Sequence, residues 1–149
     1  MSGRDLDTEV KLEIYRTIAE TARVPTVAEI AAEVDLDEET TAAAFDRLTA
    51  DRLLVLEAGT RRILMAPPFS GVPTQHVAVV DGRRYFANCA WDVLGVVAAL
   101  GRPGSIESRC EQSGKPFRLA VASDEPEPSD WLFHSLVPAA RWWDDIGFT

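Results

Sequence analysis

The chain has 149 residues, of which 46% are hydrophobic and 26% charged, and its formal net charge at pH 7 is −9. This composition is typical of a globular protein with one domain or two small ones, and it excludes a chain that is disordered over most of its length. The excess of negative charge repels polyanions, so it argues against nonspecific binding to nucleic acid or to an anionic membrane surface.

The first half of the chain carries the pattern of three helices and a β-hairpin. Helical spacing of apolar residues and turn signals predict these elements at residues 6–22, 27–34, 38–51 and 53–65. Thr26, followed three residues later by Glu29, predicts a capping box, and Asp37 is expected to cap the third helix. The residues expected to face the core are Leu6, Val10, Ile14, Ile18, Ala42, Phe45 and Leu48. This order of elements is the plan of a winged helix-turn-helix.

The second half reads as a small sheet with one helix. Strands are predicted at 75–80, 83–86, 105–110 and 116–122, with a helix from about 90 to 100. Asp81-Gly82 is the strongest hairpin-turn dipeptide of the chain. Trp131, Trp142 and Trp143 are expected to pack in the core or in a lid. The fold class is therefore α+β, with a winged-helix-like helical domain at 1–66, a turn-rich linker at 67–74 and an α+β domain at 75–149.

Two cysteines, Cys89 and Cys110, occur in the chain. The N-terminus lacks the apolar core of a signal peptide, and no apolar run approaches the ~20 residues that span a bilayer. We therefore expect a cytoplasmic protein without a membrane partner, in which both cysteines are free thiols.

Cys89 lies three residues before Asp92, at the head of an apolar run. In a helix, residues three apart are neighbours on one face, and the positive end of the helix dipole favours a thiolate. A thiolate beside a proton donor can hold a soft metal and deliver a proton to the group that the metal carries. The alternatives are that Cys89 is a small buried apolar residue and that Asp92 only stabilises the helix start.

Other candidate groups are less specific. Cys110 is either a second thiol ligand or a core residue. His76 and His134 adjoin no carboxylate cluster, so zinc ligation together with Cys89 is the weaker alternative. The third predicted helix is rich in acidic residues and the predicted wing offers only Arg61 and Arg62, so the charge pattern argues against DNA as a partner.

Several motifs of the second half occur together in a known family. They lie at residues 84–92 (RYFANCAWD), 100–102, 106–110 (IESRC), 114–116, 137–138 and 142–146 (WWDDI). With these motifs the stretch 80–149 resembles the alkylmercury (organomercurial) lyase family, which also places a winged-helix-like domain before this region. The resemblance implies an α+β domain of alkylmercury-lyase type after the helical domain.

The resemblance also implies a reaction, cleavage of a carbon–mercury bond by protonolysis. Cys89 matches the cysteine that takes up the organomercurial as a thiolate, and Asp92 matches the acid that hands a proton to the departing carbon and contacts the metal. Cys110 matches a third cysteine that matters more for structure, and it completes the expected metal-contacting set. Mercury(II) would enter and leave as substrate and product, free thiols would be co-substrates, and no cofactor would be required.

The chain departs from the family pattern in one respect. The family's second catalytic cysteine lies beyond the segment matched by 142–146, and this sequence reaches Thr149 without it. Cys110 or a cellular thiol could supply the second sulfur ligand. The first hypothesis is therefore an alkylmercury-lyase-like enzyme that acts on a small organomercurial. The second is a noncatalytic winged-helix protein that senses or sequesters a soft metal or binds another ligand, including a transcriptional regulator.

Overall fold

The structure, a computed structural model, describes residues 3–122 and 125–147, so Thr149 lies outside it. Three helices open the chain, namely α1 (Gly3–Thr21), α2 (Val27–Glu33) and α3 (Glu38–Ala50). The predicted capping box is confirmed, because the N–H of Glu29 donates to Thr26 Oγ1 and the Glu29 carboxylate accepts from the N–H of Thr26. Asp37 caps α3 as expected, by accepting from the N–H of Thr40 at 2.7 Å.

The buried faces of these helices follow the predicted spacing with two changes. Val10, Ile14 and Ile18 of α1 and Phe45 and Leu48 of α3 are buried. Leu6 and Ala42 were expected in the core and are only partly buried. In α3 the buried face includes Thr41 and Ala44, each of which lies one position before an expected core residue.

A three-stranded antiparallel sheet follows the helices, with strands in the order β1 (Val55–Leu56), β2 (Ile63–Ala66) and β3 (Phe69–Ser70). The β1–β2 hairpin was predicted, but β3 was not, because its segment had been expected to be a plain linker. Phe69 of β3 is 3% exposed and its ring packs between those of Tyr15 and Tyr85. The expected linker is thus partly a core element.

The second sheet has four antiparallel strands in the order β5–β4–β6–β7. They span Val77–Val80 (β4), Arg83–Phe86 (β5), Gly104–Arg109 (β6) and Pro116–Val121 (β7), and α4 (Ala90–Leu100) packs against β4 and β6. Asp81 and Gly82 form the predicted hairpin turn, with φ of +50° and +74°. Gly101, with φ of +63°, ends α4 in the left-handed conformation that glycine adopts without strain.

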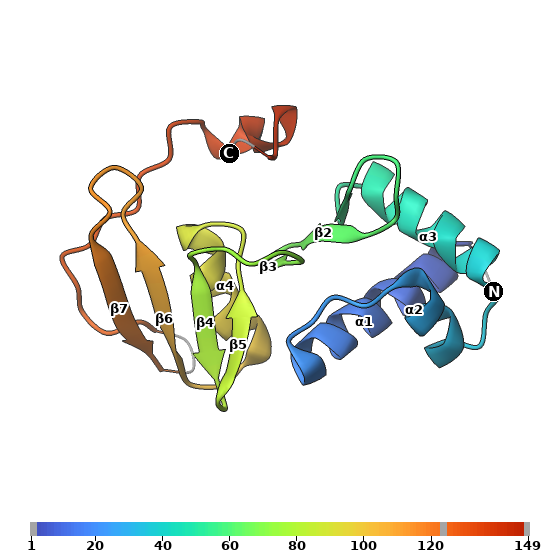
Figure 1. Cartoon of the computed structure of the whole chain (residues 1–149), viewed down its shortest axis with the longest axis horizontal. Coiled ribbons are helices and arrows are strands. Elements are labelled where there is room, and N and C mark those ends of the chain that lie inside the picture. Colours follow the sequence, from blue (N-terminus) through green and yellow to red (C-terminus); the bar gives the residue numbers. More distant parts are fainter. Residues whose placement is uncertain (1–2, 123–124, 148–149) are drawn as a thin grey trace.

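One hydrophobic core joins the helices to both sheets (Figure 1). It includes residues of α1, α3, β2, β3, β4, β5, β6 and α4. Two tyrosine hydroxyls cross between the helices and the rest of the chain, because Tyr15 donates to Pro67 O at 2.8 Å and Tyr85 donates to Ala19 O at 2.7 Å. The helical part is therefore packed directly against the four-stranded sheet.

The C-terminal segment passes beyond the end of the sheet at which β5 and β6 finish, and it ends near the short 3-10 helix η1 (Ala139–Asp144) (Figure 1). Trp131, Trp142 and Trp143 are partly exposed, and so the expectation of core burial was wrong for them. In the part of the chain that the structure covers, no helix is long and apolar enough to cross a membrane.

Candidate functional site

A cysteine and an aspartate lie together at the first turn of α4. Cys89 is the N-cap residue, and its Sγ accepts a hydrogen bond from the backbone N–H of Asp92 at 3.4 Å. The helix start is fixed at the end of β5 because Val93, Val96 and Val97 are fully buried beneath α4. The packing of this valine-lined face therefore positions the first turn of α4. The cap bond turns Sγ toward the backbone N–H of Asp92.

The thiol of Cys89 is half-buried, which changes the expectation about its ionisation. Burial raises the pKa of Cys89, and the negative charge of Asp92 adds to this effect. The N–H groups of Asp92 and Trp91 act in the opposite direction and are outweighed. The N–H groups at the helix start thus act in the predicted direction, but desolvation of the sulfur outweighs them.

Asp92 is also half-buried, and burial raises the pKa of its carboxyl group above the usual range. The side-chain amide of Asn88 opposes this shift by donating to Asp92 Oδ2 at 3.1 Å. A carboxyl group with a raised pKa holds a proton more readily and can release it to an adjacent group. The site thus contains a thiol, that of Cys89, which can lose its proton, and a carboxylate, that of Asp92, which can accept it.

Cys110 reaches the same end of the sheet as Cys89 but by another strand. Both β5 and β6 are antiparallel to β4, so they run in the same direction. The residues that follow them, Cys89 and Cys110, therefore lie at the same end of the sheet. Two strand spacings separate β5 from β6, or roughly 10 Å. Among the described residues, no group of three or more His, Cys, Asp and Glu is arranged to hold a metal ion. The structure pairs Cys89 with Asp92 and does not gather Cys110 with them into such a group.

The surroundings of Cys110 differ from those of Cys89. It begins the β6–β7 turn, where its carbonyl accepts from the N–H of Gly114. The hydroxyl and N–H of Ser113, with the N–H of Gln112, lower the pKa of Cys110. This partly exposed thiol is therefore not the apolar core residue that was one of its two alternatives.

His76 directly precedes β4, the strand between β5 and β6, and is 8% exposed. Its Nδ1 shares a hydrogen bond of 2.7 Å with Ser108 Oγ, and its Nε2 lies 3.7 Å from Glu111 Oε1. Burial lowers the pKa of His76. His134 is exposed on the C-terminal segment. The two histidines do not combine with Cys89 into a zinc-type site in the part of the chain described.

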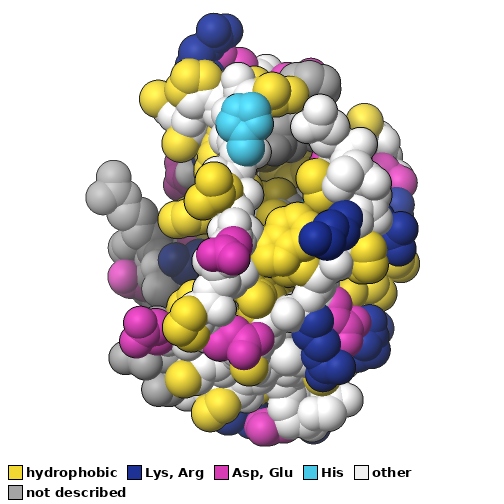
Figure 2. Space-filling view, turned by 90° about the vertical axis from the view of Figure 1, so that its left-hand side faces the viewer, with side chains coloured by type: hydrophobic (Ala, Val, Ile, Leu, Met, Phe, Trp, Pro, Cys, Tyr) yellow, Lys and Arg dark blue, Asp and Glu magenta, His cyan; other side chains and the backbone are white. Residues whose placement is uncertain are grey.

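Aromatic contacts tie the C-terminal segment to the sheet and to α4. The rings of Trp131 and Phe117 lie 4.5 Å apart, and those of Phe133 and Trp91 lie 5.6 Å apart. Lys115 Nζ lies 5.4 Å from the centre of the Trp131 ring. Figure 2, a view onto the side of β7 and the C-terminal segment, shows hydrophobic side chains around a hollow. The segment therefore borders the end of the molecule at which α4 begins.

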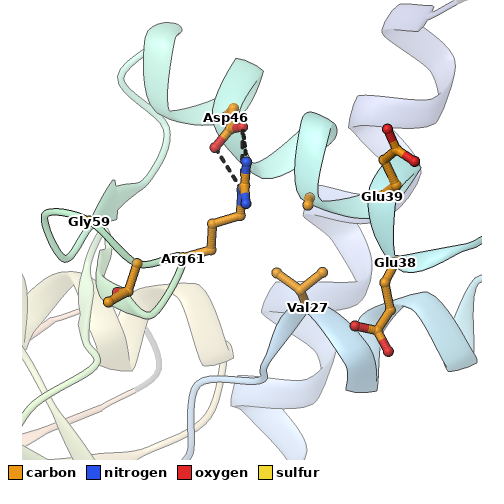
Figure 3. A pocket seen from close by; sticks show the side chains of 8 residues that line it. Val27, Glu38, Glu39, Asp46, Gly59 and Arg61 are labelled. Atoms are coloured by element: carbon orange, nitrogen blue, oxygen red, sulfur yellow. Dashed lines mark hydrogen bonds and ion pairs between the residues drawn. The ribbon is translucent and has the colours of Figure 1, made fainter.

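A second hollow lies between the helices and the β1–β2 hairpin and has an acidic lining (Figure 3). Its lining residues are Val27, Glu38, Glu39, Ala42, Asp46, Gly59, Thr60 and Arg61. Both arginines of the β1–β2 hairpin region pair with acidic neighbours, Arg61 with Asp46 (Figure 3) and Arg62 with Glu57. Guanidinium groups paired in this way are less available to neutralise phosphate.

Sequence reasoning missed Asn88 as a part of the site. The residue stands within the RYFANCAWD motif, yet its partners other than Asp92 are the carbonyls of Pro68 and Phe69, 20 and 19 residues away. No spacing rule connects an asparagine with distant backbone carbonyls. Its position immediately before the helix cap was the only signal that could have drawn attention to it.

Comparison with known proteins places this geometry in a family. The family model described as alkylmercury lyase matches residues 69–149, which include Asn88, Cys89, Asp92 and Cys110. The chain is 39% identical over 70 residues to an alkylmercury lyase of Pseudomonas putida and 43% identical over 71 residues to one of Streptomyces lividans. These matches cover 45% and 46% of the chain and 33% of each relative, so the chain matches only about a third of the length of these curated relatives.

The fold is also that of a solved structure. The crystal structure of the mercury-bound form of MerB2 matches with a TM-score of 0.65 at 22% identity, over 82% of this chain and 60% of the other. The expected α+β fold of the alkylmercury-lyase type is therefore confirmed, and with the family match over more than half of its residues, the chain belongs to the alkylmercury lyase family.

Proposed function

We propose that this protein cleaves the carbon–mercury bond of organomercurials by protonolysis, with Cys89 as the mercury-binding sulfur and Asp92 as the proton carrier. The observation that supports this most is the direct coupling of the two residues, in which Cys89 Sγ accepts the N–H of Asp92 at the start of α4. The similarity to alkylmercury lyases covers this segment. Mercury(II) is soft and prefers sulfur ligands, which makes Cys89 its natural attachment point.

The first step exchanges a proton for mercury at Cys89. An organomercurial R–Hg–X approaches the half-buried thiol, a sulfur–mercury bond forms, and X leaves as an anion. The thiol proton passes to the ionised carboxylate of Asp92. Burial favours this transfer, because it raises the pKa of Asp92 and makes its neutral form the better tolerated one.

The second step returns that proton to carbon. Protonated Asp92 donates to the carbon atom bound to mercury, the carbon–mercury bond breaks with its electron pair going to the new carbon–hydrogen bond, and the hydrocarbon RH leaves. Mercury(II) remains on Cys89, and Asp92 is again a carboxylate. Free thiols from solution then complete the mercury coordination and remove it by ligand exchange, as a cytoplasmic location would allow.

Domain roles follow from this scheme. Residues 75–149 would carry the reacting groups, and residues 1–66 would support them through the shared core rather than bind nucleic acid. Hydrocarbon release tests the proposal: purified protein with phenylmercury and excess thiol should yield benzene catalytically. Release no faster than that of a Cys89→Ser variant would contradict it.

A second candidate function is noncatalytic binding of a soft metal. It is favoured by one observation, namely that no third ligand joins Cys89 and Asp92 among the described residues. Tight, stoichiometric mercury binding without hydrocarbon release would support this alternative. Salt-sensitive binding to a defined DNA sequence would instead support a regulator, against the arginine pairing described above.

A further inference from the structure

Asn88 connects the proposed proton carrier to the core strand β3. Its Nδ2 donates to Asp92 Oδ2 at 3.1 Å and lies 3.3 Å from each of the carbonyl oxygens of Pro68 and Phe69. The amide therefore faces three acceptors with its two hydrogens. Because two of these acceptors are backbone carbonyls, an inverted amide would place oxygen against oxygen, so the hydrogen-bond partners fix which end of the amide faces Asp92.

The backbone that fixes Asn88 is itself held by packing. Phe69 is buried between Tyr15 and Tyr85. A Cβ atom on Gly95 of α4 would lie 3.2 Å from the Cβ of Pro68, so a glycine there lets the helix approach this segment closely. Asn88 thus contacts a segment that is packed against both α4 and the core.

The other end of the amide shows that Asn88 is not placed there for stability alone. Its Oδ1 is buried and has no hydrogen-bond partner among the described residues. Leaving a buried acceptor unpaired destabilises the folded state. An apolar side chain that only filled this position would not leave a buried acceptor unpaired. We therefore attribute the function of Asn88 to the NH2 group of its side-chain amide.

We infer that Asn88 is a positioning residue that holds the Asp92 carboxylate in the orientation from which it delivers its proton to carbon. The inference rests on the proposed function, and it adds a residue to which no role in the reaction has been given above. Proton delivery needs the donor oxygen within hydrogen-bond reach of the reacting atom, and a displacement of about 1 Å can lower the rate about 100-fold. The side-chain NH2 group of Asn88, which is held by the carbonyls of Pro68 and Phe69, restricts the carboxylate of Asp92 in this way.

The variant that tests this is Asn88→Leu, which keeps the side-chain size and removes the donor. We expect kcat for benzene release from phenylmercury to fall by about 10- to 100-fold with KM nearly unchanged, because mercury still attaches to Cys89. The matched control is Thr41→Val, which removes a buried side-chain donor to the backbone carbonyl of Asp37 at the start of α3. Unchanged kcat in Asn88→Leu, or an equal loss in Thr41→Val, would overturn the inference.

A readout independent of turnover separates this inference from the proposed function. NMR couplings that report χ1 of Asp92 should show one rotamer in the wild-type protein and averaging in Asn88→Leu. A single rotamer in both proteins would overturn the positioning role whether or not the wild type is active. Averaging in the variant combined with an inactive wild type would contradict the proposed function while supporting the positioning of Asp92 by Asn88.

Discussion

The backbone N–H of Asp92 donates to the Sγ of Cys89, so the residue proposed to carry the proton also caps the residue proposed to bind mercury. This bond places the sulfur over the first turn of α4, at the backbone of Asp92. Burial raises the pKa of both groups, which keeps the sulfur protonated and makes the carboxylate a better proton acceptor. Two half-buried groups with raised pKa values in one helix turn are suited to passing a single proton between them.

Replacing Asp92 by Asn should separate mercury capture from carbon–mercury cleavage. The amide keeps the size of the carboxyl group but cannot carry the proton, so hydrocarbon release should fall by at least about 100-fold. Stoichiometric uptake of phenylmercury by Cys89, followed by mass spectrometry of the adduct, should persist. Loss of uptake together with release would mean that Asp92 acts in binding instead.

The two thiols should differ in reactivity. The pKa of Cys110 is lowered by donors in its turn, whereas the pKa of Cys89 is raised by burial. Because the thiolate is the reacting form, the pH of half-maximal alkylation should lie below that of an ordinary thiol for Cys110 and above it for Cys89. Iodoacetamide labelling with peptide mass spectrometry across pH 6–10 measures both values in one sample, and coincident profiles would be inconsistent with these surroundings.

The buried histidine should make stability depend on pH. Burial lowers the pKa of His76 in the folded protein, while in the unfolded chain it returns to about 6.5. The unfolded state therefore binds more protons as the pH falls below about 6.5, so stability from neutral His76 is present above that pH and declines below it. His76→Gln should flatten the change in urea midpoint between pH 7.5 and 5. A variant that follows the wild-type slope would contradict this.

Phe69 should be important for stability although it lies in a segment rich in turns. Removing its buried ring by Phe69→Ala should lower the free energy of unfolding by about 3–5 kcal/mol, because the cavity lies between two tyrosines. Leu12→Ala, at a residue that is 61% exposed, is the control and should change it by less than about 0.5 kcal/mol. Equal effects in urea titrations would show that β3 is not part of the core.

Local signals predicted much of the fold. Thr26, Asp37 and Gly101 begin or end helices by rules that depend only on near neighbours, and each does so in the structure. Asp81-Gly82 forms its hairpin turn for the same reason. The strand β3 has only two residues, which is too short for an alternating pattern to identify it.

The properties of the site depended on distant contacts. The N–H groups at the start of α4 lower the pKa of Cys89, and this local effect can be predicted from the sequence. The burial that raises the pKa by more comes from the tertiary fold. Asn88 faces carbonyls of β3 and the preceding residue, and His76 reaches Ser108 32 residues later. The tryptophans near the C-terminus were expected in the core or in a lid, and Trp131 is partly exposed with its ring 4.5 Å from that of Phe117.

The most direct test of the central proposal compares benzene release from phenylmercury, with excess thiol, by the wild-type protein, Cys89→Ser and Cys110→Ser. The proposal predicts several turnovers by the wild type, none above background by Cys89→Ser, and at least partial activity in Cys110→Ser, since Cys110 is not grouped with Cys89 and Asp92. Equal release by the wild type and Cys89→Ser would contradict it.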